Sequence, residues 1–209
     1  FHYVTIFMFL FSYNIVSAKG KSIRVAGSTT VLPIVSRAAE KFKIKYPNTS
    51  VIINVGGSGV GFSFVADNTV DIGMMSRKIS KNEYKKNKKQ EFNVHTLGRD
   101  GVACVVSSEI YYAGIKALSK DQIRDIYSNK ITNWRNLGGP EKKIVVIDKE
   151  SHRGTRHAFM LYLFGTPTAR APGRRLVTGS NNEEHAKISQ SDSAIGMLSQ
   201  AWITKDVIG

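Results

Sequence analysis

The feature that most constrains the fold is an alternation of short apolar strands with helices, which begins at residue 23 and continues through most of the chain. Short apolar runs, typical of buried strands, occupy residues 23–26, 51–55, 71–75, 102–106, 144–147 and 194–198. Helical spacing follows in residues 32–46, with Pro33 in the first turn and Pro47 just beyond the end. Strands that alternate with helices predict an α/β fold with parallel sheets.

One of these units carries a basic loop between its strand and its helix. The apolar run ends at Asp148, a loop with Lys149, Arg153 and Gly154 follows, and Thr155 begins the next helical pattern. The first backbone N–H groups of a helix have no partner within it, and the helix dipole favours negative charge there. The unit therefore suits a bound anion, although taken alone an ordinary capped turn is the simpler explanation.

The chain repeats this arrangement. Loops rich in hydroxyl or glycine residues follow strands at residues 27–30, 56–61, 76–77 and 149–155. In an open α/β sheet, ligands bind beyond the carboxyl ends of the strands, so we expect the four loops to converge on one anion. The glycine-rich loop 56–61 matches neither a Walker A loop nor a dinucleotide-binding fingerprint, and a tight turn is the alternative explanation for it.

The first residues differ from the rest of the chain. Residues 1–16 are apolar and aromatic, and residues 16–18 supply the small side chains that a signal peptidase recognises. We therefore expect residues 1–18 to be a signal peptide and the protein to be periplasmic, with a buried N-terminal helix as the alternative. The remainder contains no apolar run of about 18 residues, the length that a membrane span requires.

Cysteine and histidine usage narrows the possible functions. Cys104 is the only cysteine and lies in an apolar strand, so it is expected to be a small buried residue without a disulfide. No cysteine lies near the end of the expected signal peptide, so lipid attachment is not expected there. The five histidines are scattered and predict no metal site, and no cofactor is expected.

The formal net charge of +14 is compatible with nucleic acid, an acidic surface or a small anion as partner. Many positive charges lie in the lysine-rich residues 78–89, where Tyr84 is the only aromatic residue. Nucleic-acid-binding segments interleave aromatic residues with such charge. We therefore predict a solvated helix face there and no nucleic-acid partner, while attraction of a small anion stays open.

Motifs in the loops and beyond make the chain resemble the substrate-binding proteins of phosphate ABC transporters, the periplasmic phosphate-binding family. They occur in the family's order over nearly all of the chain after residue 18: Gly27-Ser-Thr-Thr-Val-Leu-Pro33, Gly57-Ser-Gly59, Asp71-Ile-Gly-Met-Met-Ser-Arg77, Arg99-Asp-Gly101, Ile126-Tyr-Ser-Asn-Lys130, Asn133-Trp134, Gly154-Thr-Arg156 and Ala194-Ile-Gly196.

The resemblance implies a two-lobed periplasmic-binding-protein fold of the class II type, whose α/β lobes close on one phosphate ion. Lobe I is expected over residues 19–99 and lobe II over residues 100–200. Residues 201–209 are expected to begin a segment that returns to lobe I, with the rest of the C-terminal part missing. The resemblance also implies a monomer that delivers phosphate to membrane permease subunits and is not an enzyme.

The resemblance carries the family's phosphate ligands over to the hydroxyl and amide groups of Ser28, Thr29, Thr30, Ser58, Gly154 and Thr155. Ser76 stands where the better-known form has an Asp that accepts a hydrogen bond from protonated phosphate. Asp100 is the candidate replacement, and a salt bridge to Arg99 or Arg77 is its alternative role.

The cation of the site is a second departure from the better-known form. That form has an Arg followed four positions later by a Ser, where this chain has Lys149 and Arg153. Arg153 keeps a guanidinium that can donate two hydrogen bonds to an anion. Arg153 therefore joins the candidate set, and a contact from Lys149 stays open.

Two other functions compete with phosphate binding. The first is binding of another tetrahedral oxyanion such as sulfate. A carboxylate in the site would reject sulfate, because phosphate at neutral pH carries a proton to donate and sulfate does not. A phosphoesterase could use Ser58 or Ser151 with His152 or His157, but the sequence places no carboxylate or metal beside them.

Overall fold

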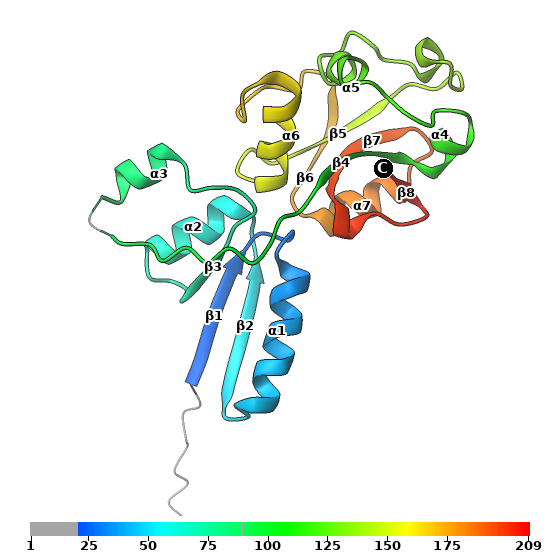
Figure 1. Cartoon of the computed structure of the whole chain (residues 1–209). Helices are drawn as coiled ribbons and strands as arrows, with labels where there is room; N and C mark the ends of the chain where they lie inside the picture. Colours follow the sequence, from blue (N-terminus) through cyan, green and yellow to red (C-terminus); the bar gives the residue numbers. More distant parts are fainter. Residues whose placement is uncertain (1–20, 89) are drawn as a thin grey trace, which may run out of the picture.

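The computed structural model describes residues 21–88 and 90–209, so the expected signal peptide lies outside the described residues. The elements form two lobes (Figure 1). Lobe I consists of β1 (Lys21–Gly27), α1 (Leu32–Lys45), β2 (Thr49–Val55), α2 (Ser58–Ala66), β3 (Ile72–Met74) and α3 (Lys81–Lys86). Lobe II consists of β4 (Val102–Ser107), α4 (Ser108–Tyr112), α5 (Lys120–Tyr127), η1 (Trp134–Leu137), β5 (Val145–Lys149), α6 (Gly154–Phe164), β6 (Arg174–Thr178), α7 (Asn181–Ser189), β7 (Ala194–Ser199), η2 (Gln200–Trp202) and β8 (Val207–Ile208).

Lobe I contains a parallel sheet with the strand order β2-β1-β3. The last residue of β1, Gly27, is level with Val55 at the end of β2 and Met74 at the end of β3. Parallel neighbours need a crossover connection, and α1 and α2 supply it. The carboxyl ends of all three strands therefore meet at one edge, and the arrowheads of β1 and β2 point toward lobe II in Figure 1.

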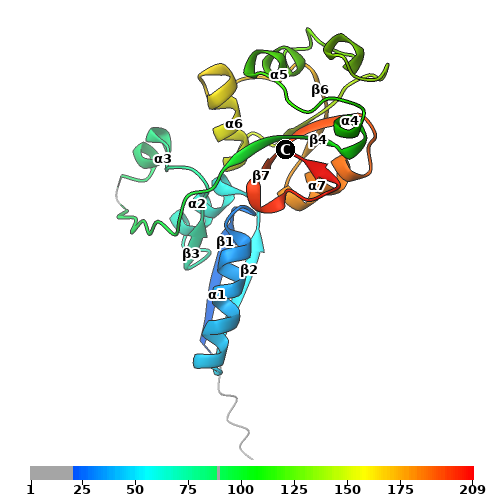
Figure 2. The ribbon, with the colours of Figure 1, turned by 45° about the vertical axis from the view of Figure 1, so that its right-hand side comes forward.

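Lobe II contains a mixed sheet with the order β6-β5-β7-β4-β8. β5 is parallel to β6 and β7, whereas β4 is antiparallel to β7 and β8. The prediction of parallel sheets is therefore wrong for β4. The segment that connects lobe I to lobe II runs directly into this strand in both views (Figures 1 and 2). No crossover helix therefore fixes the direction of β4.

The sequence pattern does not predict two strands of lobe II. β6 forms one edge of the sheet, and of its residues only Thr178 is buried, so it lacks an apolar run. Charged residues such as Arg174 and Arg175 are typical of an exposed edge strand. β8 pairs with β4, so its residues, expected to lead back to lobe I, here extend the sheet of lobe II.

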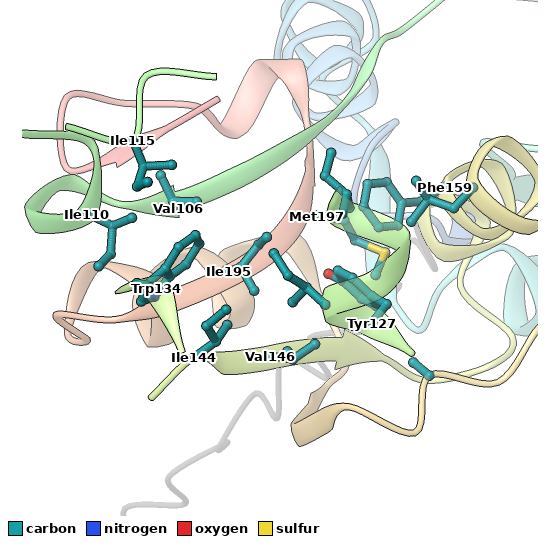
Figure 3. Packing of buried hydrophobic residues seen from close by; sticks show 14 of the residues in the cluster. Val106, Ile110, Ile115, Tyr127, Trp134, Ile144, Val146, Phe159, Ile195 and Met197 are labelled. Carbon is teal, nitrogen blue, oxygen red and sulfur yellow. The ribbon is translucent and has the colours of Figure 1, made fainter. Parts of the chain in front are cut away.

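The main core lies in lobe II around Trp134 and Tyr127 (Figure 3). Both side chains are fully buried, and their polar atoms have partners. Trp134 Nε1 donates to the carbonyl of Ser193 at 2.9 Å, and the Tyr127 hydroxyl donates to the carbonyl of Ile147 at 3.2 Å. Apolar residues of β4, α4, α5, β5, α6 and β7 pack around them, and Cys104 lies half-buried at the margin of this core.

The lysine-rich segment forms the short helix α3, and none of the helix's residues is buried, as a solvated face requires. Ser80 and Glu83 form a capping box at its start, and Arg77 donates to both carboxylate oxygens of Glu83 at 2.8 and 2.7 Å. Burial alone would raise the pKa of Glu83, but hydrogen bonds from Arg77 and Ser80 lower it to about 2. Within residues 21–88 and 90–209, no helix is long and apolar enough to cross a membrane.

Truncating the core should destabilise lobe II. Ile195 is fully buried beside Trp134, so Ile195→Ala should lower the free energy of unfolding by about 2–5 kcal/mol. Ile44 is 83% exposed, so Ile44→Ala should change it by no more than about 0.5 kcal/mol. Urea denaturation followed by far-ultraviolet circular dichroism detects unfolding of both lobes, and the fluorescence of Trp134 and Trp202 reports on lobe II alone. Equal stability of the two variants would contradict this assignment of the core.

Candidate functional site

The loops that follow the three strands of lobe I are held together at the edge of the sheet. The carbonyl of Gly27 accepts hydrogen bonds from the N–H groups of Gly56 and Gly57 at 3.0 and 2.9 Å, and Ser28 N–H donates to the carbonyl of Met74 at 2.9 Å. Gly27 has φ +138°, and a Cβ there would lie 2.1 Å from the Met74 oxygen, so only glycine fits. This junction brings Ser28, the start of α2 and the residues after β3 together.

Hydroxyl groups from these loops bond to one another. Ser28 Oγ donates to Ser76 Oγ at 2.9 Å, and Ser58 Oγ lies 3.3 Å from the same atom. Ser76 N–H also donates to Ser58 Oγ at 3.0 Å. Ser28 and Ser58 are almost completely buried. The structure therefore brings these three predicted residues together.

Lobe II reaches this point through the start of α6. A Cβ on Gly154 would lie 2.3 Å from both Ser58 Oγ and Ser76 Oγ, so the absence of a side chain is what allows the two lobes to approach. Beside it, Thr155 Oγ1 lies 3.0 Å from Thr30 Oγ1, and both residues are buried. We call Ser28, Thr29, Thr30, Ser58, Ser76 and Thr155 the hydroxyl cluster.

Asn181, the first residue of α7, also meets the cluster, although the sequence pattern does not indicate it. Its backbone N–H donates to Thr29 Oγ1 and its Nδ2 donates to Thr30 Oγ1, both at 3.2 Å. The Ser180 cap of α7 is visible in the sequence, but the strand before it is not. If the sequence pattern had indicated β6, the loop at residues 179–180 would have counted as another loop that follows a strand.

The charged group of Lys149 is already paired, so it offers no free charge to the hydroxyl cluster. It is the last residue of β5, its ammonium group forms a fully buried ion pair with Glu184, and it also donates to the carbonyl of Ser180 at 3.3 Å. Burial lowers the pKa of Lys149 and raises the pKa of Glu184, while the attraction between the two charges opposes both shifts. Thr178 Oγ1 and Met197 N–H donate to the same carboxylate at 3.1 and 2.7 Å. The pair thus joins β5, β6 and β7 to the start of α7.

A second buried ion pair holds the start of α6. Arg156 donates to both carboxylate oxygens of Asp148, at 2.9 and 3.0 Å, and to the carbonyl of Ala169 at 2.9 Å. Both partners of the pair are almost completely buried. Because Asp148 belongs to β5 and Arg156 to the first turn of α6, the pair fixes Gly154 and Thr155 relative to the sheet. The role of Arg156 in this pair is absent from the sequence-based prediction.

Arg153 lies between the two lobes. Its Nε donates to Glu150 Oε2 at 2.8 Å, and Nη2 contacts the same oxygen. Its Cδ is 2.6 Å from the place where a Cβ on Gly57 would stand, so the side chain packs on the start of α2. Within the described residues, the buried Nη1 atom of Arg153 has no hydrogen-bond partner. Arg153, not Lys149, therefore offers a free cationic donor near the cluster.

The two histidines considered for catalysis make structural contacts. His152 Nε2 lies 2.9 Å from the carbonyl of Gly56, and the carbonyl of His152 accepts from Gly59 N–H at 3.1 Å, so this residue joins the lobes. His157 Nε2 lies 2.8 Å from the carbonyl of Ser151. Burial lowers the pKa of His157. Neither histidine is hydrogen-bonded to a serine hydroxyl in the described part of the chain.

Asp100 lies in the segment that precedes β4 and belongs to none of the loops that carry the cluster. It is exposed, and the described residues include no hydrogen-bond or ion-pair partner for its side chain. Arg77, one of the two partners considered for it, is instead paired with Glu83. Of the predicted site residues, the structure brings together all except Asp100.

Removing one charge of the Lys149–Glu184 pair should destabilise lobe II. Glu184→Gln leaves the buried ammonium without a counter-charge, and we expect the free energy of unfolding to fall by about 3–5 kcal/mol. Glu141 is the matched control, because its ion pair with Arg135 is 71% exposed on both sides. Glu141→Gln should change stability little, since exposed pairs contribute little. Urea denaturation checks both variants, and a small effect of Glu184→Gln would contradict the proposed importance of the pair.

Comparisons with known proteins identify the family of the chain. A family profile described as the PBP superfamily domain matches residues 15–207. The chain is 31% identical over 197 residues to the phosphate-binding protein PstS of Bacillus subtilis, which covers 92% of this chain and 63% of that relative. The chain thus spans less than two thirds of that relative's length.

Solved structures show the same fold. A candidate phosphate ABC transporter substrate-binding protein from Clostridium perfringens, with bound phosphate, superposes with a TM-score of 0.81 at 30% identity, over 90% of this chain and 74% of that one. An ABC-type phosphate transport receptor from Vibrio cholerae gives a TM-score of 0.63 at 31% identity, over 88% and 74% of the two chains. The expected two-lobed periplasmic-binding-protein fold is thereby confirmed. The chain belongs to the PBP superfamily and, within it, to the phosphate ABC transporter substrate-binding proteins.

Proposed function

We propose that this protein binds inorganic phosphate outside the cytoplasmic membrane and delivers it to the permease subunits of an ABC importer. The observation that carries the proposal is the hydroxyl cluster, which spans both lobes where α2, α6 and α7 begin and just before α1. The phosphate named in the B. subtilis relative and bound in the C. perfringens structure supports this choice of anion.

Neutral dipoles would hold the phosphate. The first N–H groups of a helix lack partners within the helix and favour negative charge. Hydroxyl groups that now bond to each other, such as Thr30 with Thr155, can donate instead to phosphate oxygens. Arg153 would add a charged hydrogen bond through its free Nη1. The proposed ligands are therefore Ser28, Thr29, Thr30, Ser58, Ser76, Arg153, Gly154 and Thr155.

Binding would stabilise the closed arrangement of the lobes. Ser28, Ser58 and Ser76 belong to lobe I, whereas Gly154 and Thr155 belong to lobe II, so one anion that bonds to both sets favours their contact. The main-chain contact between His152 and Gly59 adds to the same interface. A permease can distinguish a loaded from an empty binding protein by this closure.

Export and assembly follow from the same proposal. Residues 1–18 have the composition of a signal peptide, which supports a periplasmic location. A protein that carries one ion between solution and a permease needs no second copy, so we propose a monomer. The lysines of α3 would face solvent and attract anions without forming a nucleic-acid site.

The phosphoesterase alternative receives no support from the site. Ser58 Oγ bonds to Ser76, and His152 bonds to a backbone carbonyl, so no base faces a nucleophile in the described residues. A chromogenic phosphate ester tests this alternative directly. We expect no hydrolysis, and turnover that survives purification of the protein would contradict the binding-protein proposal.

Calorimetric titration tests the main proposal. We expect phosphate to bind to the protein with a stoichiometry of one and sulfate to bind more weakly. Absence of phosphate binding, or tighter binding of sulfate, would contradict the proposal and favour another oxyanion as ligand.

Closure of the lobes around Gly154 gives a sharper prediction. Gly154→Ala puts a methyl group against Ser58 and Ser76, so we expect phosphate affinity to fall at least about tenfold through lost hydrogen bonds. Gly98→Ala is the control, because a Cβ there meets nothing within 4 Å and its φ is not left-handed. Unchanged melting temperature with lost binding would locate the effect in closure, whereas unchanged binding would contradict the closed site.

A further inference from the structure

The side-chain oxygen of Asn181 is a buried hydrogen-bond acceptor without a partner among the described residues. The residue is 1% exposed, and its amide Nδ2 and backbone N–H both bond to hydroxyls of the cluster. Its Oδ1 is buried and has no hydrogen-bond partner among the described residues. Burying an acceptor without a partner lowers the stability of the folded protein. We therefore expect a bound ligand to supply the missing donor.

The other groups around the cluster cannot readily play this part. Backbone N–H groups and Arg153 are donors only. The hydroxyls can both donate and accept, so they would bond to an unprotonated sulfate oxygen as well as to a protonated phosphate oxygen. The carboxylates in the same region are already engaged, since Glu184 pairs with Lys149, Asp148 with Arg156 and Glu150 with Arg153. Asp100 is exposed and belongs to none of the loops that carry the cluster. Among these side chains, Asn181 therefore keeps a free acceptor-only atom on a residue that is bonded to the cluster itself.

We propose that Asn181 is a specificity-determining residue, whose Oδ1 accepts the hydrogen bond donated by the protonated oxygen of phosphate. The inference rests on the proposed phosphate-binding function and names the group that separates phosphate from sulfate. The dianions HPO₄²⁻ and SO₄²⁻ have the same charge and the same tetrahedral shape, but only the first has a proton to donate. Sulfate would place an unprotonated oxygen against the amide oxygen and leave both unpaired.

A neutral acceptor suits a site built from neutral donors. A carboxylate would satisfy the phosphate O–H group but would also repel the anion, and it would add another buried negative charge near the Lys149–Glu184 pair. The amide oxygen accepts the same proton without that repulsion. Thr29 and Thr30 hold the backbone and the Nδ2 of Asn181, so the direction of Oδ1 is set before an anion enters.

The test compares phosphate with sulfate at mildly alkaline pH, where phosphate is mainly the dianion. The measured quantity is the ratio of the two affinities from calorimetry, in the wild-type protein and in Asn181→Ala, Asn181→Asp and the control Asn182→Ala. Asn182 is the next residue of α7 and is exposed. Asn181→Ala should lower the ratio about tenfold, the effect of one lost hydrogen bond to a charged ligand. Asn181→Asp should keep the ratio or raise it, and Asn182→Ala should leave it unchanged.

Two results would overturn the inference. The ratio of affinities could be unchanged in Asn181→Ala, even where both anions bind more weakly, as expected if the amide only donates or only braces α7. Asn181→Asp could show the same low ratio as Asn181→Ala. A wild-type protein that binds no phosphate would instead refute the proposed function, and with it this inference.

A measurement on the wild-type protein keeps the test decisive if the variants do not fold. Monofluorophosphate is a tetrahedral dianion of similar size that has no proton to donate. Wild-type protein should bind it as weakly as sulfate, because Oδ1 of Asn181 would again face an oxygen or fluorine without a proton. Binding of monofluorophosphate as tight as that of phosphate would overturn the inference.

Discussion

The structure depends on the contact between the hydroxyl groups of lobe I and the start of α6 in lobe II. On one side, Ser58 and Ser76 lie at the carboxyl edge of a parallel sheet, and on the other side Gly154 places the start of α6 directly against them. Helices α2, α6 and α7 begin at this contact, and each brings N–H groups that its own backbone cannot satisfy. The strands, the crossover helices and the glycine without a side chain all serve to bring these helix starts together.

The buried positive charges behind this contact are paired with carboxylates. The chain has a net charge of +14, yet Lys149 and Arg156, the buried cations among the described residues, are each bonded to a carboxylate. These pairs hold the first turns of α6 and α7 in position. Arg153 differs, because one of its nitrogen atoms stays free. The site is thus mostly neutral, with rigid charged supports behind it and one cationic donor beside it.

Much of this arrangement follows from sequence, and the parts that do not have physical reasons. Apolar runs predict β1, β2, β5 and β7, and the small polar loops after strands predict the hydroxyl cluster, because parallel strands end at a common edge. The edge strand β6 has no apolar run, so the loop before Asn181 is not recognised as following a strand. The partners of Lys149 and Arg156 depend on how the sheet and helices meet, which no local pattern contains. The direction of β4 depends on the path between the lobes.

The central claim is that one phosphate ion binds between the lobes at the hydroxyl cluster. A crystal structure of the protein grown with phosphate tests it most directly. The account predicts one tetrahedral anion bonded to Ser58 and Ser76 from lobe I and to Gly154 and Thr155 from lobe II, with Asn181 Oδ1 against one of its oxygens. An anion held only by the lysines of α3, or by one lobe while the other stays apart, would contradict the account.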